Sequence, residues 1–136
     1  MLQRIQSLYL LLGGALLVVF AVFSDVWSAG IRADMSWLGS VGLGLAGASA
    51  AIAFVAVALF KDRSRQRQII LVAQIATLLT VAAAVGGLFL RDPEIAATQG
   101  AYLLALAPVV AYVLLRLAQR GVDADIKLVK SMDRLR

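Results

Sequence analysis

Residues 37–60 read WLGSVGLGLAGASAAIAFVAVALF and contain no Asp, Glu, Lys or Arg. The hydrocarbon core of a bilayer is about 30 Å thick, and an α-helix crosses it with roughly 20 apolar residues. Backbone N–H and C=O groups without partners are costly in hydrocarbon, so a run of this kind is expected to be helical. The stretch therefore predicts a transmembrane helix over residues 37–60.

Three further apolar runs lie on either side of this one. They are Leu8–Phe23, extended at its start by Ile5, then Ile69–Leu90 and Ala101–Leu117. Asp92-Pro93-Glu94 has the residue types of a helix start, so the last helix is expected to begin at Pro93. The predicted spans are 5–23, 37–60, 69–90 and 93–119, and their short connections predict an antiparallel up-down four-helix bundle.

The composition agrees with one all-α integral membrane domain over residues 1–136. Mean hydropathy is +0.90 and only 15% of residues are charged, whereas about 25% are charged in soluble domains. Cysteine and histidine are both absent, so disulfides, imidazole general bases and the commonest transition-metal ligands are excluded. We therefore expect no catalytic residues, no metal site and no cofactor.

Positive charge is distributed unevenly along the chain. If the four spans alternate in direction, eleven of the 13 Lys and Arg residues lie on the side with both termini, and only Arg32 and Arg91 lie on the other. Because Lys and Arg in short loops stay in the cytoplasm, both termini are predicted to be cytoplasmic.

The segment KDRSRQR, residues 61–67, is then the cytoplasmic turn between the second and third spans. No interleaved aromatic residues accompany these cations, which argues against nucleic acid as a partner. The anionic inner leaflet is the expected partner, because each cation near its surface contributes about 1 kcal/mol.

Small residues in the second span are expected to mediate helix packing. In lipid, helices associate through close backbone approach and a few hydrogen bonds. The candidate positions are Gly39, Ser40, Gly42, Gly44 and Ala48. Ser40, Gly44 and Ala48 share one face, and Gly42, Ala46 and Ala50 share another. Packing inside one bundle is the favoured interpretation, and a homo-oligomer interface is the alternative.

Gln74, Thr77 and Thr80 are the candidate polar residues inside the membrane. Side chains of these types commonly bond to a neighbouring helix or to their own backbone, which is the favoured interpretation. The alternative is part of a substrate or proton path. Pro108 is expected to loosen the backbone near Leu104 and bend the last span.

The tail, VDADIKLVKSMDRLR at residues 122–136, spaces Val122, Ile126, Val129 and Met132 at helical intervals. It predicts a cytoplasmic amphipathic helix that lies on the inner leaflet or docks on a partner. A solvated extension of the last span is the alternative.

Both ends of the chain carry a recognisable pattern. MLQRIQSLYLLL, residues 1–12, and VKSMDRLR, residues 129–136, resemble the ends of an uncharacterised family of four-span inner-membrane proteins from Bacteroidota. The resemblance implies a bacterial inner-membrane location and no known activity. The candidate cytoplasmic interaction residues are Gln3, Arg4, Gln6, Lys130, Asp133 and Arg134, with Arg4 and Asp133 as a possible pair.

Two functions remain open from the sequence. The first is a non-catalytic structural or accessory subunit whose cytoplasmic end groups and tail helix contact another membrane protein or the inner leaflet. The second is a small transporter or channel with a weakly polar path near Gln74, Thr77 and Pro108. A membrane enzyme ranks last, because acid–base or metal chemistry needs clustered carboxylates, His or Cys.

Overall fold

The structure, a computed structural model, describes residues 2–24, 36–90 and 99–133, and for residues 2–4, 99, 101 and 133 only the backbone is described. Arg32, Arg91, the helix start predicted at Pro93 and tail residues 134–136 lie outside the described residues.

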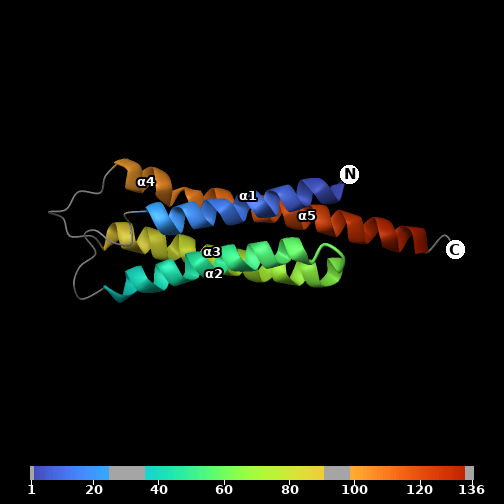
Figure 1. Cartoon of the computed structure of the whole chain (residues 1–136), viewed down its shortest axis with the longest axis horizontal. Coiled ribbons are helices and arrows are strands. Elements are labelled where there is room, and N and C mark those ends of the chain that lie inside the picture. Colours follow the sequence, from blue (N-terminus) through green and yellow to red (C-terminus); the bar gives the residue numbers. More distant parts are fainter. Residues whose placement is uncertain (1, 25–35, 91–98, 134–136) are drawn as a thin grey trace.

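Helices dominate the described part of the chain (Figure 1). They are α1 (Leu2–Phe23), α2 (Trp37–Ala58), α3 (Arg63–Phe89), α4 (Gln99–Ala105) and α5 (Ala107–Asp133). By length and composition, the described residues include four helical stretches that could cross a membrane, which are Ile5–Phe23, Trp37–Ala58, Arg63–Phe89 and Tyr102–Met132. For the described residues this confirms the prediction of an all-α protein with four helices long and apolar enough to span a membrane.

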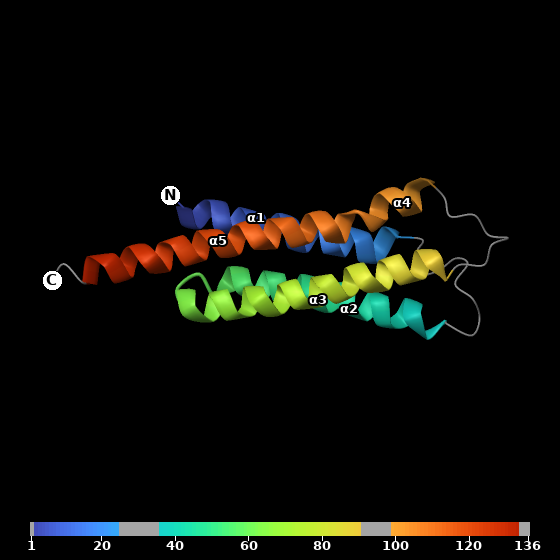
Figure 2. The ribbon, with the colours of Figure 1, turned by 180° about the vertical axis from the view of Figure 1, so that it is seen from behind.

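The helices form a bundle in which neighbours run antiparallel (Figures 1 and 2). Helix α1 packs against α2 and α5, and α3 packs against the same two helices, so the order around the bundle is α1, α2, α3, α5. The start of α1, the turn at Leu59–Asp62 and the end of α5 all lie at one end. We call this end the basic end, because it carries the cations of the 61–67 segment and of α5.

Many small residues lie in the bundle interior beside a few large ones such as Leu10, Phe20 and Leu115, and large apolar residues cover much of the outside. On α3 the buried positions include Ala73, Ala83 and Ala84, whereas Ile75 and Leu79 are 60% and 51% exposed. A soluble bundle would bury its largest apolar side chains. The many exposed large apolar residues, together with the small buried ones, fit helices that associate by close backbone approach while hydrocarbon covers their outer faces.

Helix α2 uses only one of its two small-residue faces inside the bundle. Gly39 and Gly42 are buried, as are Ala46 and Ala50. Ser40, Gly44 and Ala48 are exposed, and a Cβ added at Gly44 would meet nothing within 4 Å. The packing inside one bundle that we predicted for Ser40, Gly44 and Ala48 is therefore wrong. Residues two apart differ by about 200° around a helix, so this face points away from the neighbours that the other face contacts.

The last span is interrupted as its proline predicts. Helix α4 ends at Ala105 and α5 begins at Ala107. The N–H of Leu106 donates to the carbonyl of Leu103 at 3.2 Å, and regular bonding resumes where Val110 N–H donates to Leu106 at 3.0 Å. Pro108 has no N–H to donate to Leu104, which explains the break.

The connection between α2 and α3 is shorter than the predicted 61–67 turn. It comprises Leu59 to Asp62, and Arg63 already belongs to α3. Asp62 is the N-cap, and its Oδ1 accepts a hydrogen bond from the Arg65 backbone N–H at 3.1 Å. The Asp62 carboxylate bonds to a backbone N–H that has no partner within the first helical turn. Helix α3 therefore starts at Arg63, six residues before the apolar run Ile69–Leu90.

The tail does not form a separate helix in the described residues. Residues 122–133 continue α5 without interruption, as the alternative of an extended last span predicts, and the predicted amphipathic helix on the inner leaflet or on a partner is not confirmed. Val122 and Asp125 are buried, and Ile126 packs against the core that α1, α2 and α3 build. The first part of the apolar face of the tail, Val122 and Ile126, is therefore covered by the chain's own helices, whereas Val129 and Met132 are exposed.

Candidate functional site

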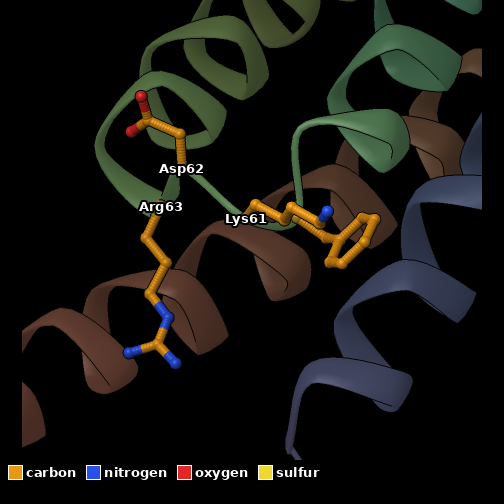
Figure 3. Close-up of a pocket in the computed structure, with 4 residues that line it drawn as sticks. Lys61, Asp62 and Arg63 are labelled. Atoms are coloured by element: carbon orange, nitrogen blue, oxygen red, sulfur yellow. The ribbon is translucent and has the colours of Figure 1, made fainter.

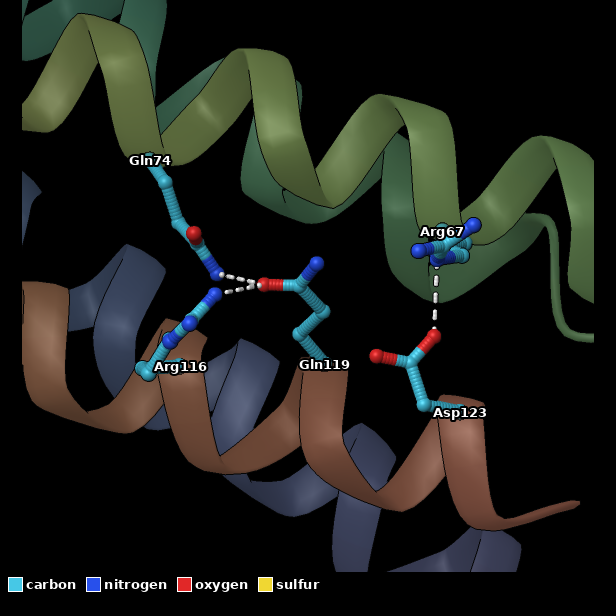
Figure 4. Close-up of polar contacts among 5 residues, drawn as sticks. All are labelled: Arg67, Gln74, Arg116, Gln119 and Asp123. Carbon is cyan, nitrogen blue, oxygen red and sulfur yellow. Dashed lines mark hydrogen bonds and ion pairs between the residues drawn. The ribbon is translucent and has the colours of Figure 1, made fainter.

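Polar side chains connect α3 and α5 inside the bundle (Figure 4). The Nε2 of Gln74 donates to Oε1 of Gln119 at 2.9 Å and to the carbonyl of Leu115 at 3.2 Å. Arg116 donates from Nη1 to the same Gln119 oxygen at 2.8 Å. Gln74 and Gln119 are both 4% exposed. The Gln119 oxygen therefore serves as a shared acceptor that joins the two helices.

The hydroxyl groups predicted beside Gln74 are bonded as well. Thr77 donates to the Ala73 carbonyl at 2.7 Å, and Thr80 donates to Ala76 at 2.9 Å. The Thr80 hydroxyl also lies 3.4 Å from the hydroxyl of Ser49 on α2. These bonds agree with the structural interpretation of Gln74, Thr77 and Thr80, in which such side chains bond to a neighbouring helix or to their own backbone.

An ion pair connects α3 and α5 nearer the basic end. The Nε of Arg67 lies 2.7 Å from Oδ1 of Asp123 (Figure 4), and the two side chains are 51% and 35% exposed. A pair exposed to this extent contributes about 0 to 1 kcal/mol in solution. Its main effect is to fix the position of the Arg67 guanidinium beside α5.

Helix α1 is tied to α5 by a buried hydrogen bond. Gln6, 5% exposed, donates from Nε2 to Oδ2 of Asp125 at 3.2 Å. Gly121 makes room for this contact, because a Cβ there would lie 2.6 Å from Cγ of Gln6. On the other side of the bundle, Gln66 of α3 donates to the Ala56 carbonyl of α2 at 3.0 Å. Hydrogen bonds therefore join each of these helices to a neighbour at the basic end.

Two surface hollows lie at the basic end. The first, about 670 Å³, is lined by Phe60, Lys61, Asp62 and Arg63 at the α2–α3 turn (Figure 3). There the Lys61 ammonium lies 5.9 Å from the centroid of the Phe60 ring. The second, about 330 Å³, lies between α3 and α5 and is lined by Arg67, Asp123, Ile126, Lys127 and Lys130. Both hollows carry more cations than acids, and the excess is one charge in the first and two charges in the second.

Metal chemistry has no evident location in the described residues. No three His, Cys, Asp or Glu side chains gather there into a group that could hold a metal ion. The absence of a cofactor and of catalytic activity stays a prediction.

Comparison with known proteins yields one family. Residues 31–135 match the model of a domain of unknown function, DUF4293. The chain belongs to this family. No curated protein and no solved structure matches the chain.

The DUF4293 match covers α2 to α5 and starts after the end of α1. It confirms that the chain belongs to an uncharacterised family. Both end patterns, MLQRIQSLYLLL and VKSMDRLR, and the bacterial lineage stay predictions.

The structure describes only some of the predicted cytoplasmic interaction residues of this DUF4293 member. Gln6 is buried against α5, and Lys130 lines the α3–α5 hollow. The side chains of Gln3, Arg4 and Asp133, and all of Arg134, lie outside the described residues, so the pair of Arg4 with Asp133 is untested.

Sequence reasoning missed several residues that the fold brings together. These are Gln66, Arg116, Gln119, Asp123 and Asp125. One available signal was that Arg116, Arg120, Asp123, Lys127 and Lys130 recur every three or four residues and so share one helix face. That spacing identifies a polar face but does not identify the helix beside it.

Proposed function

We propose that this chain is a non-catalytic subunit of a bacterial inner membrane, in which the bundle anchors α5 and the end of α5 contacts another membrane-associated protein. The observation that carries the proposal is the reach of α5. Its last turns extend past the start of α1 and past the α2–α3 turn at the basic end (Figure 2). Side chains there have few neighbours within the chain, and Lys127 to Met132 are all exposed.

The orientation follows from the charge distribution. In the topology predicted from the sequence, eleven of the 13 Lys and Arg residues lie on the side of the membrane with both termini. The positive-inside rule favours a cytoplasmic position for that side. The projecting turns of α5 would then meet cytoplasmic partners and the anionic inner leaflet.

The composition of the projecting turns supports a protein contact. Leu128, Val129 and Met132 are 52%, 40% and 62% exposed. At about 100° per residue, they lie on roughly the opposite side of α5 from Lys127 and Lys130. Exposed apolar residues grouped at the water-facing end of a helix are typical of an interaction surface.

Transport through the bundle is less well supported. The Gln74 amide donates to α5, and Thr77 donates to its own helix. A path for solute needs polar groups that face a water-filled space, whereas these groups are occupied by hydrogen bonds. The interior polarity therefore supports helix association more than it supports a transport path.

The test compares the full chain with a variant that ends after Ile126. This truncation removes the projecting turns but keeps Val122, Asp125 and their contacts with the bundle. We expect proteins captured from mild detergent with the full chain to be lost with the truncated chain and with Leu128→Ser/Met132→Ser. The control is Lys61→Gln, which changes the hollow at the α2–α3 turn and leaves the end of α5 intact. This variant should still capture the proteins. If all variants capture the same proteins, the proposed role of the α5 end is wrong.

A further inference from the structure

The α3–α5 hollow is a different surface from the apolar face of the projecting turns. It is lined by Arg67 of α3 and by Asp123, Ile126, Lys127 and Lys130 of α5. We propose that this hollow binds the phosphate of an anionic phospholipid, with the acyl chains lying along the outer surfaces of α3 and α5.

The charge of the hollow matches a phosphodiester. Its three cations and one carboxylate leave a net charge of +2. Its volume of about 330 Å³ falls within the range of roughly 300 to 1,000 Å³ found for small-ligand sites. Basic pockets between transmembrane helices near the cytoplasmic surface are known to hold anionic lipid headgroups.

Arg67 is prepared for an additional anion. Its Nε is paired with Asp123 at 2.7 Å, and the side chain is still 51% exposed. A guanidinium has five N–H donors, which is more than one carboxylate oxygen accepts. Asp123 therefore positions the guanidinium at the edge of the hollow and leaves donors for a phosphate oxygen.

The cations of α5 form a continuous face that reaches toward the bilayer. Arg116, Arg120, Lys127 and Lys130 occupy the same side of the helix as Asp123, with spacings of three and four residues. Arg120 is exposed between the hollow and Arg116. Arg116 lies about 10 Å along the axis from Asp123, on the side of the membrane core. Positive charge therefore extends along α5 over the part of the membrane interface that a phospholipid headgroup and its link to the acyl chains would occupy.

An apolar surface continues beneath these cations, which favours a lipid over a free anion. Leu71 and Leu78 share the Arg67 face of α3 and are 37% and 48% exposed. On α5, Val109 and Val113 lie deeper on the cationic face and are 42% and 51% exposed. Basic groups above and exposed aliphatic groups below match the two parts of a phospholipid, whereas a soluble phosphate would use only the upper part.

The test measures phospholipid binding to the purified full chain in non-ionic detergent by native mass spectrometry. The probes are phosphatidylglycerol and phosphatidylcholine. We expect phosphatidylglycerol to bind more tightly, and Lys127→Gln/Lys130→Gln to weaken it about 30-fold, because each cation near an anionic headgroup contributes roughly fivefold in affinity. Lys127→Arg/Lys130→Arg should keep the wild-type affinity.

Lys61→Gln/Arg65→Gln is the matched control, since it removes the same charge at the same end of the bundle. Neither Lys61 nor Arg65 lines the α3–α5 hollow, so binding should change less than threefold. Equal losses in the two double variants, or no loss in either, would overturn the proposal. Displacement of phosphatidylglycerol by excess inorganic phosphate would also overturn it, by showing that the site takes a soluble anion.

This measurement needs no partner protein, so its failure would leave the proposed subunit role untouched. The Leu128→Ser/Met132→Ser variant keeps every residue of the hollow, so its loss of partner capture would likewise say nothing about the hollow. Circular dichroism of each double variant, with helical signal equal to that of the unmodified chain, shows that a change in lipid binding is not a loss of fold.

Discussion

Gly121 of α5 lies against Gln6 of α1, and replacing it with alanine should loosen this contact. The new Cβ would lie 2.6 Å from Cγ, 2.8 Å from Nε2 and 3.0 Å from Cδ of Gln6. Gln6 has little room to move away, because it is 5% exposed and its amide donates to Asp125. We therefore expect Gly121→Ala to displace the Gln6 side chain and break its hydrogen bond.

Three contributions set the size of the effect. Alanine is favoured over glycine inside a helix by roughly 0.5 to 1 kcal/mol. Overpacking of a closely packed contact costs about 1 to 3 kcal/mol. The Asp125 carboxylate, 8% exposed, would lose the donor that satisfies it, at a cost of about 1 to 3 kcal/mol. These terms predict that Gly121→Ala lowers the free energy of unfolding by about 3 kcal/mol.

Unfolding in mixed micelles, followed by far-ultraviolet circular dichroism, measures this quantity, and two comparisons isolate the clash. In a Gln6→Ala background the obstructing side chain is gone, so Gly121→Ala should become stabilising by about 0.5 to 1 kcal/mol. Gly44→Ala is the control on the outer surface, where the added Cβ meets nothing within 4 Å, and it should be stabilising in either background. The reasoning is refuted if Gly121→Ala stabilises the unmodified chain as Gly44→Ala does, or if removing Gln6 leaves its effect unchanged.

Three further predictions test the interior, the helix start and the topology. Gln74→Leu removes two hydrogen bonds between α3 and α5 and should lower the free energy of unfolding by about 1 kcal/mol. The same variant should leave ion or solute flux in proteoliposomes unchanged, and a lower flux would favour the transporter function. Asp62→Ala removes the N-cap of α3 and should cost about 1 kcal/mol in the same unfolding assay, while Asp62→Asn should cost less. Single cysteines at the exposed positions Ser64 and Ser131 should react with an impermeant thiol reagent from the same side of the membrane, and reaction from opposite sides would contradict the bundle topology.

The four spans and their alternation could be predicted from local features. Each span is an uninterrupted apolar run, and in hydrocarbon such a run satisfies its backbone only as a helix. The break at Leu106 was also local, because Pro108 lacks the N–H that would bond to Leu104. In contrast, the start of α3 at Arg63 depended on a single capping side chain beyond the apolar run.

The predictions that differ from the structure concern helix faces, one on the tail and one on α2. The spacing of residues along a helix shows that such a face exists but does not show what it contacts. The periodic apolar residues of the tail would suit a lipid surface, another protein or the chain's own core. In the structure, Val122 enters that core and Asp125 meets Gln6. The two small-residue faces of α2 were likewise equivalent in composition, and only one of them meets another helix.

The amino-acid order by itself determined which segments are helical and which solvent they require, because those properties depend on hydrophobicity and backbone bonding within each segment. Its charges also predict an orientation, through the bias of Lys and Arg toward one end. Only the tertiary structure decided that Gln74 meets Gln119, that Arg67 meets Asp123 and that Gln6 fits over Gly121. Such pairings depend on the rotation and axial position of one helix against another, and the spacing of residues along a single helix does not contain that information.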